Sequence, residues 1–232
     1  MLQKTNLFIL LVVLLGGQMS LQGQCKAYFP FKENTSLTYT TYNRKGKVQN
    51  TSTHTISSIE QMDDGALKAT VKVENEDKKG AQSSGVSFDV YCKNNTLEMD
   101  FSSLVSPEMQ ASFENMEVTI SGDNFKLPSN LKVGQELPDI HAEIETAMNG
   151  FTVMTMVIEQ TNKKVEAKES ITTDAGTFEC YKISYDTSLK AIMRVKSHQV
   201  VWYNEEVGMV KEEIYNKRGK LDSWQELTAY KK

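Results

Sequence analysis

The sequence predicts a mainly β fold: curved antiparallel sheets or an open, incomplete barrel, with one short helix near residues 105–116. The first indication is a period-two alternation of apolar and polar residues, as in Leu67, Ala69, Val71 and Val73, which is typical of half-buried strands. The second is the recurrence of turn residues between these runs. The third is that a single segment departs from this pattern and follows helical spacing.

The expected strands are bounded by the positions where the alternation begins and where turn residues end it. They lie near residues 36–43, 47–59, 66–76, 84–92, 96–101, 117–121, 140–147, 151–161, 164–171, 176–186, 189–196, 199–204, 207–216 and 220–229.

The predicted helix at 105–116 has a recognisable beginning. Ser106 can cap it, Pro107 suits the first helical position, and Glu108 favours the positive end of the helix dipole. Its apolar residues recur at helical spacing and share one stripe. That stripe suits a helix packed on the core, and it also suits a lid over a pocket in the sheet.

A methionine-rich segment follows at 148–158, and its strand part is apolar on both faces apart from threonines. A strand of this kind is buried on both faces or lines a cavity on one. Methionine adapts to irregular partners and recurs at promiscuous apolar surfaces. The candidate ligand-binding residues, from the helix stripe and from this segment, are therefore Met109, Phe113, Met116, Met148, Phe151, Met154 and Met156. A core filled with methionine is the alternative.

The N-terminus predicts export, with residues 1–24 as a signal peptide. Lys4 supplies a positive start, residues 7–15 are uninterrupted and apolar, and small or polar residues follow. The apolar run is too short to span a bilayer, which takes about 20 residues. We expect a periplasmic or secreted protein that is not an integral membrane protein after cleavage.

The mature chain holds three cysteines, Cys25, Cys92 and Cys180. Export favours a disulfide, and an odd number leaves one thiol free. The sequence does not fix the pairing. We favour Cys25–Cys92, which would join the N-terminal tail to a strand end, with Cys180 as a buried thiol. Lipid anchoring at Cys25 is the less favoured alternative, because Gln24 stands where a lipoprotein signal needs Gly or Ala.

Residues 25–232 suit a single β domain, either undivided or built from two meander halves at 28–121 and 140–230 with a turn-rich connector at 122–139. Two segments, 42–48 and 215–221, are alike in sequence, and 77–80 is a weaker third copy. Each places polar residues and a glycine between β-rich flanks, which predicts three similar hairpin turns.

Composition and motifs exclude several classes of function. The net charge is −4 and the basic residues are scattered, which does not suit a nucleic-acid partner. His54, His141 and His198 lie at no metal-ligand spacing to one another or to a cysteine. The alternating polar residues of 139–145 are expected to be a solvated strand face. We predict no catalytic residue, no metal and no cofactor.

Several segments resemble the TapB-like family of exported bacterial proteins of the Bacteroides type, a family whose domain has no known function. They are Tyr28–Asn34, Tyr42–Lys47, Val118–Asp123, Leu131–Asp139, Val165–Ser170, Ala175–Tyr185 and Val207–Lys211. The resemblance covers nearly the whole mature chain. It implies a bacterial cell-envelope location and an antiparallel β fold, and it implies no reaction.

Two functions are compatible with these expectations. The first is a non-catalytic binding protein that holds a lipid, another apolar small molecule or an envelope protein on a concave β surface. The second is a structural or assembly module with a filled core and no ligand. A sheet curled around an apolar interior allows either, because such an interior is filled by side chains or holds a ligand.

Overall fold

The computed structural model describes residues 25, 28–99 and 117–232, and within them all regular structure is β. The strands form one antiparallel sheet of 13 strands in the order β6-β8-β9-β10-β11-β12-β13-β1-β2-β3-β4-β5-β7. The end strands β6 and β7 do not pair with each other, so the sheet is open. The strands are β1 (Ser36–Asn43), β2 (Val48–Gln61), β3 (Leu67–Asp77), β4 (Gln82–Lys93), β5 (Thr96–Met99), β6 (Glu117–Gly122), β7 (Phe125–Pro128), β8 (Ile140–Met148), β9 (Phe151–Thr173), β10 (Gly176–Lys190), β11 (Arg194–Asn204), β12 (Gly208–Asn216) and β13 (Leu221–Lys231).

The predicted open antiparallel fold is confirmed, with three corrections to the strands. The expected strands at 151–161 and 164–171 are one continuous strand, β9, and β7 lies inside the expected connector. The expected strand at 189–196 is wrong, because the chain turns between β10 and β11. The predicted helix at 105–116 lies outside the described residues. No helix in the part that the structure describes is long and apolar enough to cross a membrane.

The three similar turns have the same hydrogen bonds. The side-chain oxygen of Asn43 accepts from the backbone N–H of Lys45 and of Lys47. Asn216 accepts in the same way from residues 218 and 220, and Asp77 from residues 79 and 81. The glycine of each turn has a positive φ of 69° to 80°. An Asx side chain followed by glycine is therefore the repeated element that the sequence similarity encodes.

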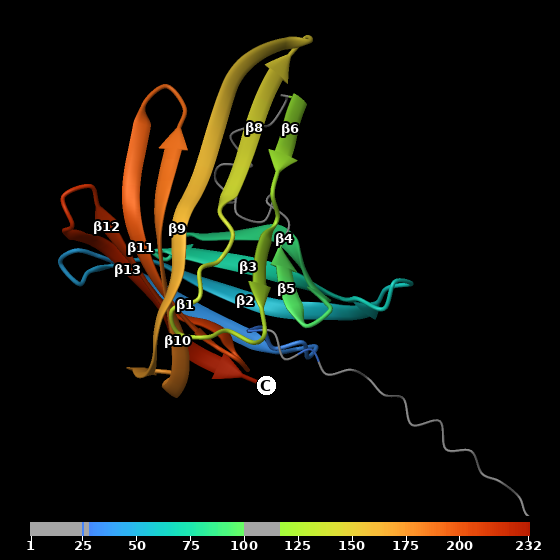
Figure 1. Ribbon diagram of the computed structural model, residues 1–232, viewed down its shortest axis with the longest axis vertical. Coiled ribbons are helices and arrows are strands. Elements are labelled where there is room, and N and C mark those ends of the chain that lie inside the picture. The colour runs from blue at the N-terminus through green and yellow to red at the C-terminus, as the bar shows by residue number, and fades with distance from the viewer. Residues whose placement is uncertain (1–24, 26–27, 100–116) are drawn as a thin grey trace, which may run out of the picture.

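The sheet bends into two arms. In Figure 1, β2–β4 run across the view while β8, β9 and the β10–β11 hairpin stand upright. The strand β9 shifts register twice against β10, next to Ile183 and next to Ser184. Such bulges bend a strand and increase its twist. The two predicted halves share this one sheet, because β1 pairs with β13 along its whole length.

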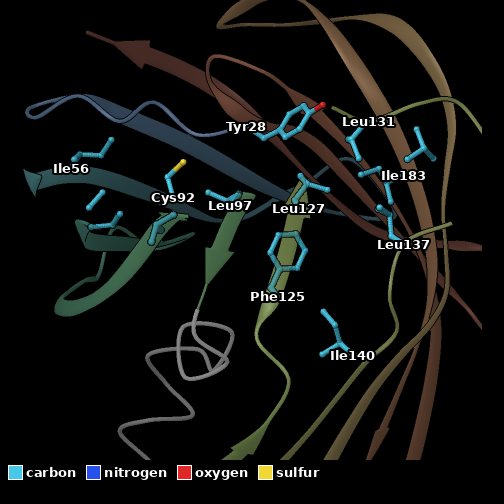
Figure 2. Close-up of a cluster of buried hydrophobic side chains, with 14 residues drawn as sticks. Tyr28, Ile56, Cys92, Leu97, Phe125, Leu127, Leu131, Leu137, Ile140 and Ile183 are labelled. Carbon is cyan, nitrogen blue, oxygen red and sulfur yellow. The ribbon is translucent and has the colours of Figure 1, made fainter. Parts of the chain in front are cut away.

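The arms meet in a buried apolar cluster, shown in Figure 2. One arm contributes Ile56, Val71, Val90 and Leu97, and the other contributes Val165 and Ile183. The connector between β7 and β8 adds Leu131 and Leu137 to the same cluster. We call the side of the sheet that carries this cluster the inner face, and the opposite side the outer face.

The N-terminal segment closes this cluster. Tyr28 is buried, and its ring lies edge-on to Tyr181 at 6.1 Å and to Tyr203 at 6.4 Å. A Cβ at Gly208 would lie 2.7 Å from the carbonyl oxygen of Tyr28, and Gly208 has a φ of +84°. Glycine is therefore required there, both for its backbone conformation and for the close approach of the N-terminal segment.

The cysteines pair as favoured above. Cys25 and Cys92 form a disulfide with a Cα–Cα distance of 6.2 Å, and Cys180 is a free, buried thiol. Burial raises the pKa of the Cys180 thiol to about 12, so the thiol is protonated at neutral pH. The disulfide attaches the N-terminal segment to β4 beside the core cluster.

Removing the disulfide should destabilise the protein. Its ends are 67 residues apart, and a cross-link across a loop of this length restricts the unfolded chain enough to be worth about 2–4 kcal/mol. The double variant Cys25→Ser, Cys92→Ala should lose that much free energy of unfolding in urea denaturation. The wild type in reductant should match the variant. An unchanged urea midpoint in both would contradict the cross-link.

Candidate functional site

The structure separates the predicted ligand-binding residues into two groups. Met148 and Phe151 flank the β8–β9 turn and are exposed, with 78% of Phe151 accessible. Met154 is half-buried, and Met156 is buried in a small cluster with Ala142 and Ile144. The remaining three candidates, Met109, Phe113 and Met116, lie outside the described residues. The segment 151–158 was expected to be buried on both faces or to line a cavity on one, but its first residues, 151–153, are exposed.

Strand register extends the Met156 cluster into a longer row. Ile140 belongs to the core cluster, and the next residues on its face are Ala142 and Ile144, because alternate residues of a strand share a face. Ile144 pairs with Ile120 on one side and Met156 on the other. The same register argument continues across β9, β10 and β11. The inner apolar stripe comprises Val118, Ile120, Ala142, Ile144, Met154, Met156, Ile158, Leu189 and Val195.

The stripe is buried in its middle and open at its ends. Ala142, Ile144 and Met156 are buried, whereas Val195 on β11 is 58% exposed and Ile120 on β6 is also exposed. The exposed apolar side chains of the stripe therefore lie at its two ends and are separated by its buried middle.

Three titratable groups, Glu212, Tyr185 and Tyr203, lie on the inner face near the core cluster. Glu212 pairs with Val201, and Val201 pairs with Ile183 of the core cluster, so the three side chains share a face. Burial raises the pKa of the Glu212 carboxyl to about 7. Burial also raises the pKa values of Tyr185 and Tyr203, and the neighbouring Glu212 carboxylate adds to both shifts. Perturbed pKa values are enriched at functional sites.

His54 lies on the inner face of the other arm. Its ring is 5.1 Å from the ring of Tyr39 and 5.9 Å from that of Phe88. Burial lowers the pKa of His54 to about 4, so the imidazole is neutral at physiological pH. The Tyr39 hydroxyl donates to the carbonyl oxygen of Met209 at 3.2 Å, which links the arm with β1 and β2 to β12.

Lys163 is a buried cation on the inner face. It is 4% exposed, and its Nζ lies 5.1 Å from the ring centre of Phe125 and 5.4 Å from that of Tyr185. Burial lowers the pKa of its amine to about 8, against the attraction of Asp139. Two aromatic faces thus stabilise an ammonium group that has left water.

The outer face carries a polar depression of about 630 Å³, lined among others by Asp186, Ser188, Lys196 and His198. Its lining includes none of the predicted ligand-binding residues. His198 Nδ1 lies 2.9 Å from Asp186 Oδ1, and both side chains are about half exposed. Most of its lining residues are polar or charged, so it offers few apolar side chains to the apolar ligand that the sequence predicts.

The polar strand face at 139–145 is solvated in part. Ile140, Ala142 and Ile144 are buried, Asp139 and His141 are exposed, and Glu143 and Glu145 are half-buried. Among the described residues, no group of three or more His, Cys, Asp or Glu side chains is arranged to hold a metal ion.

Replacing Glu212 by Gln should change how stability depends on pH. The carboxyl titrates near pH 7 when folded and near 4.5 when unfolded, so the folded state holds more protons between these values. Its stabilisation is complete below about pH 4.5 and is lost as the pH rises through 7. Glu212→Gln should equal the wild type at pH 4.5 and be more stable by roughly 1–3 kcal/mol at pH 8.

Urea denaturation at a series of pH values measures this difference. Glu205→Gln provides the control, because it makes the same chemical change at an exposed side chain. A constant difference between Glu212→Gln and the wild type from pH 4.5 to 8 would show that Glu212 is not enclosed as described.

Replacing Lys163 by Met should stabilise the protein at neutral pH. The folded pKa near 8 lies below the unfolded value of 10.5, so below about pH 8 both states are charged and the folded state bears the desolvation cost. Lys163→Met should gain roughly 1–3 kcal/mol at pH 7, and the gain should shrink as the pH rises toward 10.5. Thermal unfolding of the variant checks this, with the exposed Lys164→Met as control. A Lys163→Met variant less stable than the wild type at pH 7 would mean that the two ring contacts outweigh desolvation.

Comparisons with known proteins give the family and the fold. Residues 32–227 match the DUF3108-like family. A candidate exported protein of Bacteroides fragilis NCTC 9343, with a YmcC-like fold, superposes with a TM-score of 0.70 at 20% identity, over 88% of this chain and 98% of that chain. A candidate lipoprotein of Parabacteroides distasonis ATCC 8503 gives 0.69 at 22% identity, with the same coverage. No curated protein matches the chain. The TapB-like assignment remains a prediction.

Proposed function

The chain belongs to the DUF3108-like family, and we propose that it is an exported, non-catalytic binding protein of the cell envelope that holds the acyl chain of a lipid on the inner apolar stripe. The observation that carries the proposal is the stripe itself: one row of apolar side chains that crosses five adjacent strands and ends in exposed residues.

The dimensions of the stripe favour a linear ligand. Five neighbouring strands at a spacing of about 4.8 Å give a row roughly 19 Å long and about two side chains wide. A compact apolar molecule would use a fraction of this length, whereas an extended hydrocarbon chain can contact the exposed and partly exposed members along it. The partly exposed members Met154, Ile158 and Leu189 lie along the row between its open ends. Methionine also tolerates chains of differing shape.

The N-terminus supports release of the protein from the membrane after export. Residues 1–24 have the composition of a signal peptide. A lipoprotein carries its acyl groups on the sulfur of the N-terminal cysteine, and in this chain that sulfur is bonded to Cys92. The disulfide and the lipid anchor are mutually exclusive, so the disulfide favours periplasmic or secreted protein over anchored protein.

The second candidate is a structural or assembly module without a ligand. The burial of Ala142, Ile144 and Met156 favours it, because these three side chains are already removed from water. The two functions differ at the ends of the stripe: only the binding protein needs the exposed residues there to be apolar.

Acyl-chain binding can be measured with a fluorescent fatty acid in equilibrium titration. The stripe variants are Ile120→Asp and Val195→Asp, at two exposed positions at opposite ends of the row. Each should raise the Kd at least tenfold, because a charge in contact with hydrocarbon carries a desolvation cost. Met154→Trp should also block uptake, by filling the middle of the row.

The matched control is Ile192→Asp, at an exposed apolar residue in the turn that leads to the strand of Val195 and outside the stripe. It should bind the probe as the wild type does. Wild-type protein that binds no probe, with all variants folded, would favour the module and contradict the proposed function.

A further inference from the structure

Two neighbouring hairpins end in exposed apolar side chains. We call these side chains the apolar tips: Met148, Phe151 and Val153 on the β8–β9 hairpin, and Ile192 and Met193 between β10 and β11. Ile192 is 94% exposed and Met193 is 77% exposed. A monomeric protein seldom leaves such a set in water unless it meets a partner there.

Both tips project from the same end of the sheet. The last β10 residue, Lys190, pairs with Val157 of β9, so the β8–β9 hairpin continues beyond the β10–β11 turn. Figure 1 shows both turns at the upper end of the view, away from the C-terminus. The β10–β11 turn is held by a hydrogen bond from Ala191 N–H to the Met193 carbonyl oxygen at 3.1 Å. The tips therefore belong to ordered hairpins.

The charges beside the β10–β11 tip are positive. Lys190, Arg194 and Lys196 flank Ile192 and Met193 and are exposed, and residues 187–197 contain no carboxylate. Acidic groups lie on the other side: Glu145 accepts a hydrogen bond from the Thr152 hydroxyl, and the exposed Glu117 pairs with Ala147 beside Met148. A bilayer surface has hydrocarbon beneath a layer of head groups, some of them anionic. Apolar side chains at the end of a hairpin can reach the hydrocarbon, while cations farther back on the hairpin contact the anionic head groups.

We propose that the apolar tips dock this protein on a lipid bilayer that contains anionic lipids. Ile192, Met193 and Phe151 enter the boundary between head groups and hydrocarbon, while Lys190 and Arg194 contact lipid phosphates. Long cationic side chains reach head groups from apolar surroundings without losing their charge contacts. The contact is peripheral and reversible, and it is independent of acyl-chain binding on the inner stripe.

Vesicle co-sedimentation of the mature chain tests the proposal. Vesicles of phosphatidylethanolamine and phosphatidylglycerol at 3:1 should retain the wild type, and vesicles of phosphatidylcholine alone should retain at least tenfold less. The double variant Ile192→Asp, Met193→Asp should lose at least tenfold in partitioning to the anionic vesicles. Lys190→Gln with Arg194→Gln should reduce anionic binding toward the phosphatidylcholine level, and added salt should do the same to the wild type.

The control is Val133→Asp, which changes an apolar residue that is 58% exposed and lies in the connector. It should bind vesicles as the wild type does. The proposal is overturned if the wild type binds neither vesicle, or if the tip variant binds as well as the wild type. It is also overturned if the wild type forms a dimer in solution that the tip variant loses, because the tips would then be a contact between two copies.

This outcome is separable from that of the proposed function. The tip variant should bind the fluorescent fatty acid normally, and Ile120→Asp should bind vesicles normally. If the protein binds fatty acid but no vesicle, the proposed function stands and this inference fails. If it binds vesicles but no fatty acid, this inference stands and the proposed function fails.

Discussion

The packing of one arm of the sheet against the other is the interaction on which the rest of this structure depends. An open sheet of 13 strands has too large an apolar face to leave in water, and burying apolar surface is the main driving force for folding. Here the sheet covers itself: β2–β5 supply one side of the cluster, β9 and β10 supply the other, and the connector fills between them. Bulges in β9 provide the bend, and Tyr28 with the Cys25–Cys92 disulfide closes the N-terminal side.

This arrangement also explains where the unusual groups lie. Where the arms approach, the inner face buries Lys163 and half-buries Glu212 and His54. Loss of water shifts the pKa of each of these groups in the direction that favours its neutral form. Farther along β8 and β9 the same face continues as the inner apolar stripe. The strands continue past the stripe to the apolar tips. The inner face thus carries the stripe that we propose for acyl-chain binding, and the projecting hairpins carry the tips that we propose for membrane docking.

Much of the fold followed from local patterns in the sequence. Period-two alternation located most strands, and the three Asx-and-glycine turns were recognisable because a turn is specified by its own residues. Other features depended on partners far away in the chain. The strand β9 was divided because polar residues at 161–164 resemble a turn, whereas bulges opposite β10 and the connector hold that segment in the sheet. The β10–β11 turn was missed because residues 189–195 are apolar apart from Lys190 and Arg194 and contain neither Gly nor Pro.

The candidate site was predictable only in part. The methionine-rich segment lies on a strand that carries part of the inner apolar stripe, since Met154 and Met156 belong to it. The role of Glu212 was hidden, because Glu213 beside it looks the same in sequence and faces the other way, toward Lys211. The exposure of Ile192 depends on where a turn falls, which alternation did not reveal.

Native mass spectrometry of protein purified from its own host tests the central claim most directly. If the inner face of the folded sheet holds an acyl chain, the folded protein should carry an added mass of a lipid that is released on denaturation. The Ile120→Asp variant, purified in the same way, should lack that mass. Wild-type protein that shows only the mass of the processed polypeptide, with its disulfide intact, would contradict the account.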